Sequence, residues 1–82
     1  MKYTIGQAVG ERILELLEAK KMTQYRLGVE SGLTHPAIGR IINEKNKTVN
    51  FKTVAMIANG FGMTLMEFLD APYFDFKNLD IE

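Results

Sequence analysis

Three polar residues at helical spacing, His35, Arg40 and Asn43, offer this chain's most specific recognition chemistry. An arginine can donate two hydrogen bonds to O6 and N7 of guanine, and an asparagine can pair with N6 and N7 of adenine. A histidine can donate or accept a hydrogen bond. Each good pairing discriminates by roughly 1–3 kcal/mol, so two or three contacts suffice for modest specificity. These residue types therefore suit the reading of base edges.

These side chains share one face only if residues 35–43 form a helix. At about 100° per residue, one arc is polar or small and contains His35, Pro36, Gly39, Arg40 and Asn43. The other arc is apolar, and we expect it to be buried; it contains Ala37, Ile38 and Ile41. Taken singly, an arginine or asparagine on a helix is more often ordinary surface. His35 suits a local hydrogen bond near the helix start equally well.

Two short helices that cross at a tight turn are predicted between Gln24 and Asn43. Gly28 is small enough to let the two helices approach closely. Gly32 can adopt the left-handed conformation that ends a helix without steric cost. The polar strip left on the second helix has the width that a DNA major groove admits. The pair of helices, rather than any one side chain, favours a nucleic-acid interface.

Start and stop signals predict five helices in all. They cover residues 8–20, residues 24–31 after the cap Thr23, residues 35–43 after the cap Thr34, a segment from the cap Asn50 to Gly62, and a last segment from the cap Thr64 to before Pro72. Pro36 fits the first turn of the third helix, where a missing amide hydrogen costs nothing. Residues 44–49 are a polar connection without helical period, and residues 73–76 are compatible with a short strand.

Composition limits the class of protein. The chain has 82 residues, 46% hydrophobic and 24% charged, which fits one soluble globular domain. It has no cysteine and one histidine, so we expect neither disulfides nor a metal site, and no cofactor. No apolar run approaches the roughly 20 residues needed to span a bilayer. The first ten residues do not resemble a secretory signal. We therefore expect a cytoplasmic protein without membrane contact.

The formal net charge is zero, but the charges are unevenly distributed. Residues 20–52 carry seven lysines and arginines against two glutamates, a net charge of +5. Residues 53–82 carry one lysine against five acidic residues, a net charge of −4. A molecule with opposed charges can attract phosphate on one side only. Charge clusters are more often solvated surface, so this pattern alone does not establish nucleic-acid binding.

Four segments together resemble the phage-repressor-like (Cro-like, or XRE) helix-turn-helix transcription regulators. They occur in the family's order and separation and are Met22–Gln24, Ser31–Thr34, Ile38–Asn43 and Phe51–Ala58, the last followed by Phe61–Thr64. The resemblance covers roughly residues 9–69. Three positions depart from it, since Gly28 stands where alanine is usual, Gly39 where a polar contact residue is common and Glu44 where glycine is frequent.

The resemblance implies an all-α, compact five-helix DNA-binding domain at residues 1–70, with a C-terminal tail at residues 71–82. Residues 35–43 would enter the major groove of double-stranded DNA as the recognition helix. Base contacts are expected from Thr34, His35, Pro36, Gly39, Arg40 and Asn43. Phosphate contacts are expected from Thr23, Gln24, Lys45, Asn46, Lys47, Lys52 and Thr53. The lysines, and free amides where a helix starts near Asn50, suit phosphate on physical grounds as well.

We therefore expect a sequence-specific transcription regulator, acting as a repressor, without catalytic activity. Two copies would bind an inverted repeat and pair through the last helix and the apolar tail, unless the tail folds back on its own core. The alternative function is a protein-interaction module or an antitoxin-like regulatory subunit that retains the fold. An enzyme lacks support, because Ser31 is the one serine and no carboxylate pair or phosphate loop is evident. No small-molecule ligand is inferred.

Overall fold

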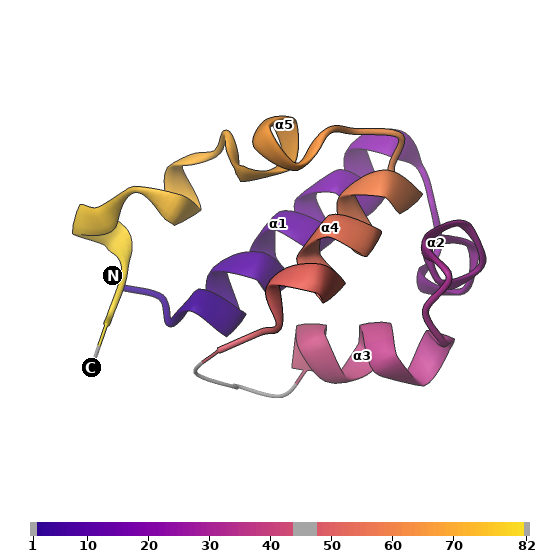
Figure 1. The fold of residues 1–82 in the computed structure, drawn as a ribbon, viewed down its shortest axis with the longest axis horizontal. Helices are drawn as coiled ribbons and strands as arrows, with labels where there is room; N and C mark the ends of the chain where they lie inside the picture. Colours follow the sequence, from indigo (N-terminus) through magenta and orange to yellow (C-terminus); the bar gives the residue numbers. More distant parts are fainter. Residues whose placement is uncertain (1, 44–47, 82) are drawn as a thin grey trace.

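The computed structural model describes residues 2–43 and 48–81 and is all-α in those ranges (Figure 1). Five α-helices and two short 3₁₀-helices follow one another: α1 (Ile5–Lys20), α2 (Gln24–Ser31), α3 (His35–Asn43), α4 (Phe51–Gly60), α5 (Leu65–Leu69), η1 (Pro72–Phe74) and η2 (Phe76–Asn78). The prediction of a five-helix, all-α fold is confirmed.

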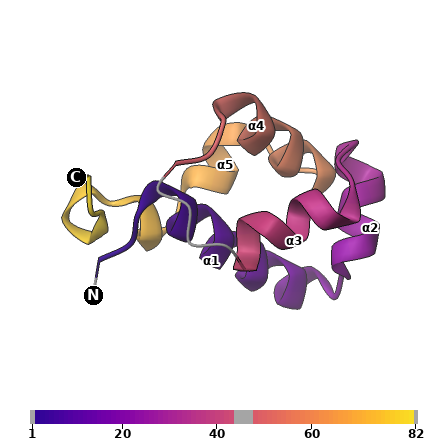
Figure 2. The same cartoon turned by 90° about the horizontal axis from the view of Figure 1, so that it is seen from below.

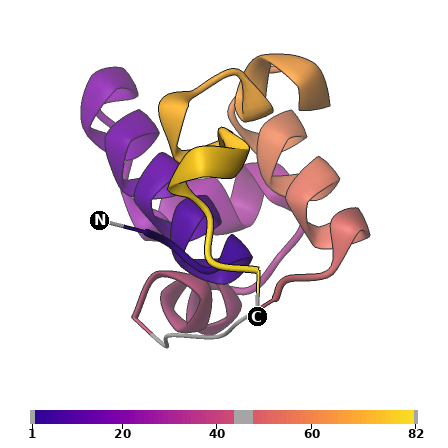
Figure 3. The same cartoon turned by 90° about the vertical axis from the view of Figure 1, so that its left-hand side faces the viewer.

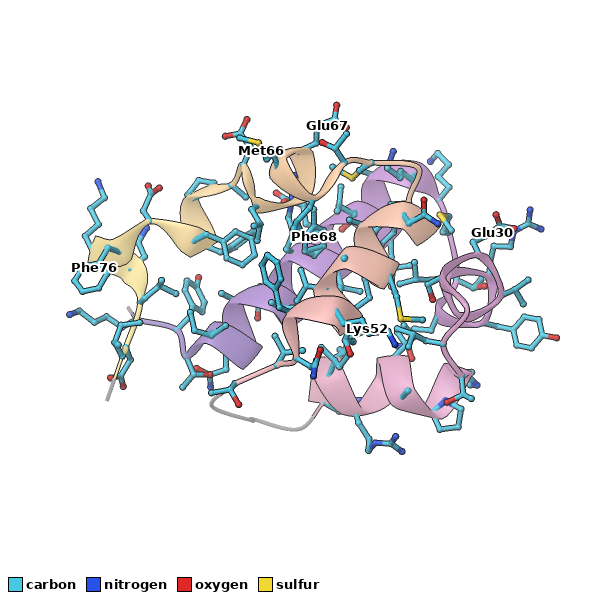
Figure 4. All side chains as sticks on the ribbon, in the orientation of Figure 1. Glu30, Lys52, Met66, Glu67, Phe68 and Phe76 are labelled. Atoms are coloured by element: carbon cyan, nitrogen blue, oxygen red, sulfur yellow. The ribbon has the colours of Figure 1, made fainter. Side chains whose placement is uncertain are left out.

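The helices surround one apolar core. Seen from below, α3 lies nearest the viewer, across the space between α1 and α4, with α2 at its N-terminal end (Figure 2). The largest fully buried side chains come from all five α-helices and are Val9, Ile13, Leu27, Ile38, Ile57 and Phe68. Phe68, the one core residue labelled in Figure 4, lies in the interior. Burial of Ile38 attaches α3 to this core, since each large aliphatic side chain removed from water contributes roughly 1.5–3 kcal/mol.

The start of α1 differs from the expectation of residue 8, because the helix begins at Ile5. The Thr4 hydroxyl accepts a hydrogen bond from the Gln7 amide (3.1 Å), and the Gln7 side chain accepts one from the Thr4 amide (2.9 Å). This reciprocal capping box satisfies two amides that a helix start leaves unpaired. Threonine followed three positions later by glutamine is the sequence pattern that indicates this helix start.

The predicted caps of α2, α4 and α5 are confirmed. Thr23 accepts from the Arg26 amide, Asn50 from the Lys52 amide and Thr64 from the Glu67 amide. The Glu67 carboxylate in turn accepts from the Thr64 amide (2.8 Å). This hydrogen bond lowers the pKa of Glu67, because it favours the charged carboxylate.

Three glycines stand where helices meet backbone to backbone. A Cβ on Gly10 would lie 3.1 Å from the carbonyl oxygen of Ile41, and one on Gly28 would lie 3.1 Å from that of Leu33. A Cβ on Gly60 would lie 2.8 Å from the Cβ of Ser31. The expectation that Gly28 permits a close approach is confirmed, and Gly10 and Gly60 act similarly for the α1–α3 and α4–α2 pairs.

Arg12 fastens the last helix to the first. Its Nε donates to the carbonyl of Phe68 (2.7 Å) and its Nη2 to the carbonyl of Glu67 (2.9 Å), while Nη1 pairs with Glu15 (2.8 Å). The guanidinium also lies 5.9 Å from the centre of the Phe68 ring. Cations stabilise the C-terminal end of a helix, where carbonyls lack intrahelical partners. Arg12 therefore serves the fold.

The possible strand at residues 73–76 is wrong, because that segment forms η1 and the start of η2. Pro72 fixes the first residue of η1, and the Asp75 amide donates to its carbonyl (3.1 Å). The tail then crosses in front of α1 when the molecule is viewed from its end (Figure 3). Phe74 packs on the core, and Leu79 is buried and forms an isolated bridge with Tyr3.

We predict that Gly60→Ala lowers the free energy of unfolding by about 1–3 kcal/mol, the usual range for overpacking. The added carbon would meet the Cα and amide nitrogen of Ser31 at 3.0 Å, and backbone atoms cannot move aside like a flexible side chain. Urea unfolding followed by circular dichroism measures the change.

Gly39→Ala is the matched control, because a Cβ there finds ordinary contact distances of 3.6 and 3.9 Å. It should raise the free energy of unfolding by about 0.5–1 kcal/mol, the usual advantage of alanine in a helix. Equal effects at the two sites would contradict the packing argument.

Candidate nucleic-acid interface

The α2–α3 turn is built from side-chain and backbone groups that hold one another. Gly32 ends α2 in the left-handed region, with φ of 79°, as expected. The buried Ser31 hydroxyl donates to the Gly28 carbonyl and accepts from the Leu33 amide, both at 3.3 Å. The turn therefore uses the hydroxyl of Ser31 to satisfy backbone groups.

Thr34 begins α3 as predicted. Its hydroxyl accepts a hydrogen bond from the Ala37 amide (3.2 Å), and its carbonyl accepts one from the Ile38 amide (3.1 Å). Pro36 lies in the first turn, where helices tolerate it. The start of α3 is therefore fixed by local chemistry before any partner binds.

The outward face of α3 carries the predicted polar groups. His35, Pro36, Arg40 and Asn43 are exposed, Gly39 is half-buried, and Ile38 on the opposite side is fully buried. No other helix of the described ranges covers α3 when the molecule is seen from below (Figure 2). Imidazole, guanidinium and carboxamide groups therefore lie on one solvent-facing surface.

The expectation that Ala37 and Ile41 are buried is only partly met, because both are half-buried. Ile41 and Ile42 pack against the edge of the core rather than within it. At Gly10, the backbone of α1 approaches the Ile41 carbonyl and prevents α3 from sinking deeper. Ile38 is the buried residue of α3, and Ile41 and Ile42 add contacts at the edge of the core.

Gln24, the first residue of α2, reaches the middle of α3. Its Oε1 lies 3.6 Å from the position that a Cβ of Gly39 would occupy, and Asn43 Nδ2 lies 3.9 Å from the same position. The half-buried Gln24 side chain thus lies beside Gly39 and Asn43 of α3. This placement fits the role that the family resemblance implies for Gln24, which is to brace α3.

Tyr25 was not among the candidate residues, yet its ring lies edge-on to His35 at a centroid distance of 6.4 Å. Its side chain is 69% exposed. Edge-to-face aromatic pairs are favourable by about 0.5–1.5 kcal/mol when ordered. The tyrosine therefore limits the orientations open to His35. The two residues are ten positions apart, so no local sequence pattern indicated the contact.

The candidate phosphate ligands fall into two groups around α3. Thr23 is exposed just before α2, and Lys52 and Thr53 lie in the first turn of α4. Figure 4 shows Lys52 near α3. The Lys52 amide is already bonded to the Asn50 side chain (2.8 Å), so fewer amides are free there than expected. Lys45, Asn46 and Lys47 lie outside the described residues.

Charged side chains also lie on α2 and α1, the two helices beside α3. Arg26 on α2 pairs with Glu30 (Nη2 to Oε1, 3.2 Å) in an exposed i,i+4 arrangement. On α1, Glu11 and Glu15 lie beside Tyr73 of the tail. Burial and these two carboxylates raise the pKa of Tyr73, because its anion would be poorly solvated and repelled. These carboxylates lie on α1, beside the tail, and not on α3.

Neither a metal centre nor a membrane span is found in the part of the chain that the structure describes. No three of its histidine, aspartate and glutamate side chains gather closely enough to hold a metal ion. None of its helices is both long and apolar enough to cross a membrane.

We predict that Thr34→Ala lowers the free energy of unfolding by about 1 kcal/mol, because the Ala37 amide loses its acceptor. Thr34→Ser keeps the hydroxyl and should remain within a few tenths of a kcal/mol of the parent. Urea unfolding without DNA measures both. Equal losses in the two variants would assign the effect to the threonine methyl group instead of the cap.

Comparison with known proteins supports the same interpretation. No curated protein sequence matches the chain. The crystal structure of a mutant of the restriction-modification controller protein C.Esp1396I is similar, with a TM-score of 0.72 at 24% identity, over 80% of this chain and 84% of that chain. This similarity establishes a shared fold.

The family model for the Cro/C1-type helix-turn-helix DNA-binding domain matches residues 12–72. The matched segment begins in α1, includes all of α2 to α5 and ends at the first residue of η1. The chain therefore belongs to the Cro/C1-type helix-turn-helix DNA-binding domain family.

Proposed function

We propose that this protein is a sequence-specific regulator of transcription, a repressor, that inserts α3 into the major groove of double-stranded DNA. The observation that carries the proposal is the division of α3 into a buried side at Ile38 and an exposed side with His35, Arg40 and Asn43. A helix with its polar side uncovered and its start already capped can enter the groove without refolding.

Contacts divide into reading and positioning groups. Arg40 reads guanine, Asn43 reads adenine, and His35 donates to or accepts from a neighbouring base. Thr34, Pro36 and Gly39 complete the surface that faces the bases. Thr23, Gln24, Lys52 and Thr53 hold the flanking phosphates, as do Lys45, Asn46 and Lys47 in the segment beyond α3. We assign no catalytic step to any of these residues.

Selection of bound fragments from random duplex DNA tests the function directly. We expect a defined sequence to be enriched and its affinity to fall with salt, with a slope of about −0.9 per phosphate contact on a log–log plot. A protein-interaction module would enrich no sequence.

Arg40→Ala should relax the preference at one base pair, with a loss of about 1–3 kcal/mol in discrimination there. The fold should be unchanged, because the side chain is exposed. Binding to single-base variants of the selected duplex measures the change. Unaltered preference at every position would show that α3 does not read the bases as proposed.

Lys52→Ala is the control for Arg40→Ala, because we propose that Lys52 contacts a DNA phosphate and Arg40 a base. It should weaken all sequences alike and flatten the salt slope by about one unit. A change confined to one base pair would exclude a phosphate role for Lys52.

We also propose that two copies bind together on an inverted repeat, with half-sites about one helical turn (~34 Å) apart. Met66 of α5 is 82% exposed, Phe76 of the tail 78% and Ile81 55%, and these apolar groups suit a partner surface. The tail lies at one end of the long axis and α3 along one side (Figure 1). Pairing across that end keeps both α3 helices facing the same way.

Sedimentation at micromolar concentration tests the pairing. We expect a dimer, at least on DNA, and Phe76→Asp should weaken it because a charge would have to be buried. A protein that remains monomeric both alone and on the selected duplex would contradict the paired arrangement.

A further inference from the structure

Among the residues that the structure describes, none gives a packing reason for position 39 to be glycine. Surroundings are defined for six glycines of the described chain, and five of them have either a close backbone neighbour or a positive φ. Gly10, Gly28 and Gly60 allow close backbone approach, and Gly32 and Gly62 have positive φ. At Gly39 a Cβ would meet only ordinary contact distances, and the residue lies inside α3, where glycine is unfavourable relative to alanine.

Gly39 lies in the middle of the exposed face of α3, where a missing side chain affects what can contact the helix. His35, Gly39 and Asn43 follow one another at spacing i, i+4 and i+8 along the exposed face, and Arg40 and Pro36 lie next to that row. Gly39 is therefore central on the surface that the proposed function turns toward the bases. The two described atoms near its absent Cβ are Gln24 Oε1 at 3.6 Å and Asn43 Nδ2 at 3.9 Å.

The chemistry of the exposed backbone limits what can contact Gly39. In the middle of an α-helix the backbone amide and carbonyl are hydrogen-bonded within the helix. Residue 39 therefore offers a partner no free donor or acceptor, and its exposed surface is the apolar Cα. The adjacent Pro36 ring is apolar as well. The major-groove edges of the bases carry one apolar feature, the 5-methyl group of thymine, and 5-methylcytosine carries the same group.

We propose that Gly39 is a specificity-determining residue that admits the 5-methyl group of a pyrimidine against the bare backbone of α3. The inference rests on the proposed insertion of α3 into the major groove. A methyl carbon in contact with the Gly39 Cα lies about 3.5–4.0 Å from it. In the proposed arrangement the methyl group approaches from the side on which another residue would carry its Cβ, so that atom would hold the base farther from the backbone.

The experiment removes the methyl group from the DNA and adds one to the protein. Each thymine of the duplex selected by the parent protein is replaced in turn by deoxyuridine, which lacks only that methyl group. We expect about a fourfold loss of affinity at one thymine in each half-site, the worth of one buried methyl group. Gly39→Ala should bind the thymine duplex less tightly and show no loss on deoxyuridine replacement there.

A second arm identifies the source of the methyl group. Each cytosine is replaced in turn by 5-methylcytosine. A gain in affinity that the parent shows and Gly39→Ala lacks would assign the contact to 5-methylcytosine, whereas the deoxyuridine effect assigns it to thymine. Either result supports the inference.

Loss of folded protein would not explain weaker DNA binding by Gly39→Ala, because this variant is expected to be more stable than the parent. Asn59→Ala provides the matched control, since it raises helix propensity at an exposed position of α4 without altering α3. It should retain the parent's response to deoxyuridine.

Two results would overturn the inference. If Gly39→Ala and the parent respond alike at every thymine and cytosine, the residue does not read a methyl group. If Gly39→Ala weakens all duplexes by one factor, glycine serves general approach of the backbone. In both cases the proposed function survives. Failure of the parent to select any sequence would instead overturn the proposed function, and this inference with it.

Discussion

The placement of α3 depends on contact between polypeptide backbones. One end of the helix lies against α2 at Gly28, and the other lies against α1 at Gly10. Between these points Ile38 is fully buried in the core. Protein interiors are packed densely enough that a single added carbon is felt, so two missing side chains fix both the height and the direction of α3. The polar face turns outward as a consequence.

Stability and recognition use different parts of the same small fold. Arg12 joins α1 to α5, and capping boxes stabilise the starts of these two helices. The exposed residues of α3 take part in few contacts of this kind, apart from the ring contact between Tyr25 and His35. Side chains on this face can therefore change with little effect on the core, in line with the rule that one fold can carry different sites.

Local signals in the sequence predicted most of the fold. Caps at Thr23, Thr34, Asn50 and Thr64 and the glycine at position 32 have meanings set within a few residues, and the structure agrees with each. The exposed face of α3 followed from helical period alone.

Features that depend on distant parts of the chain were not predictable in this way. The hydrogen bonds of Arg12 reach across 55 and 56 positions, and the close contact of Gly60 with Ser31 joins two helices. Tyr3 lies beside Leu79 for the same reason. The amide of Tyr3 donates to Asn78 and its carbonyl accepts from Asp80. The described ends thus meet at one edge (Figure 1), and a short peptide could join them into a circularly permuted chain that opens elsewhere.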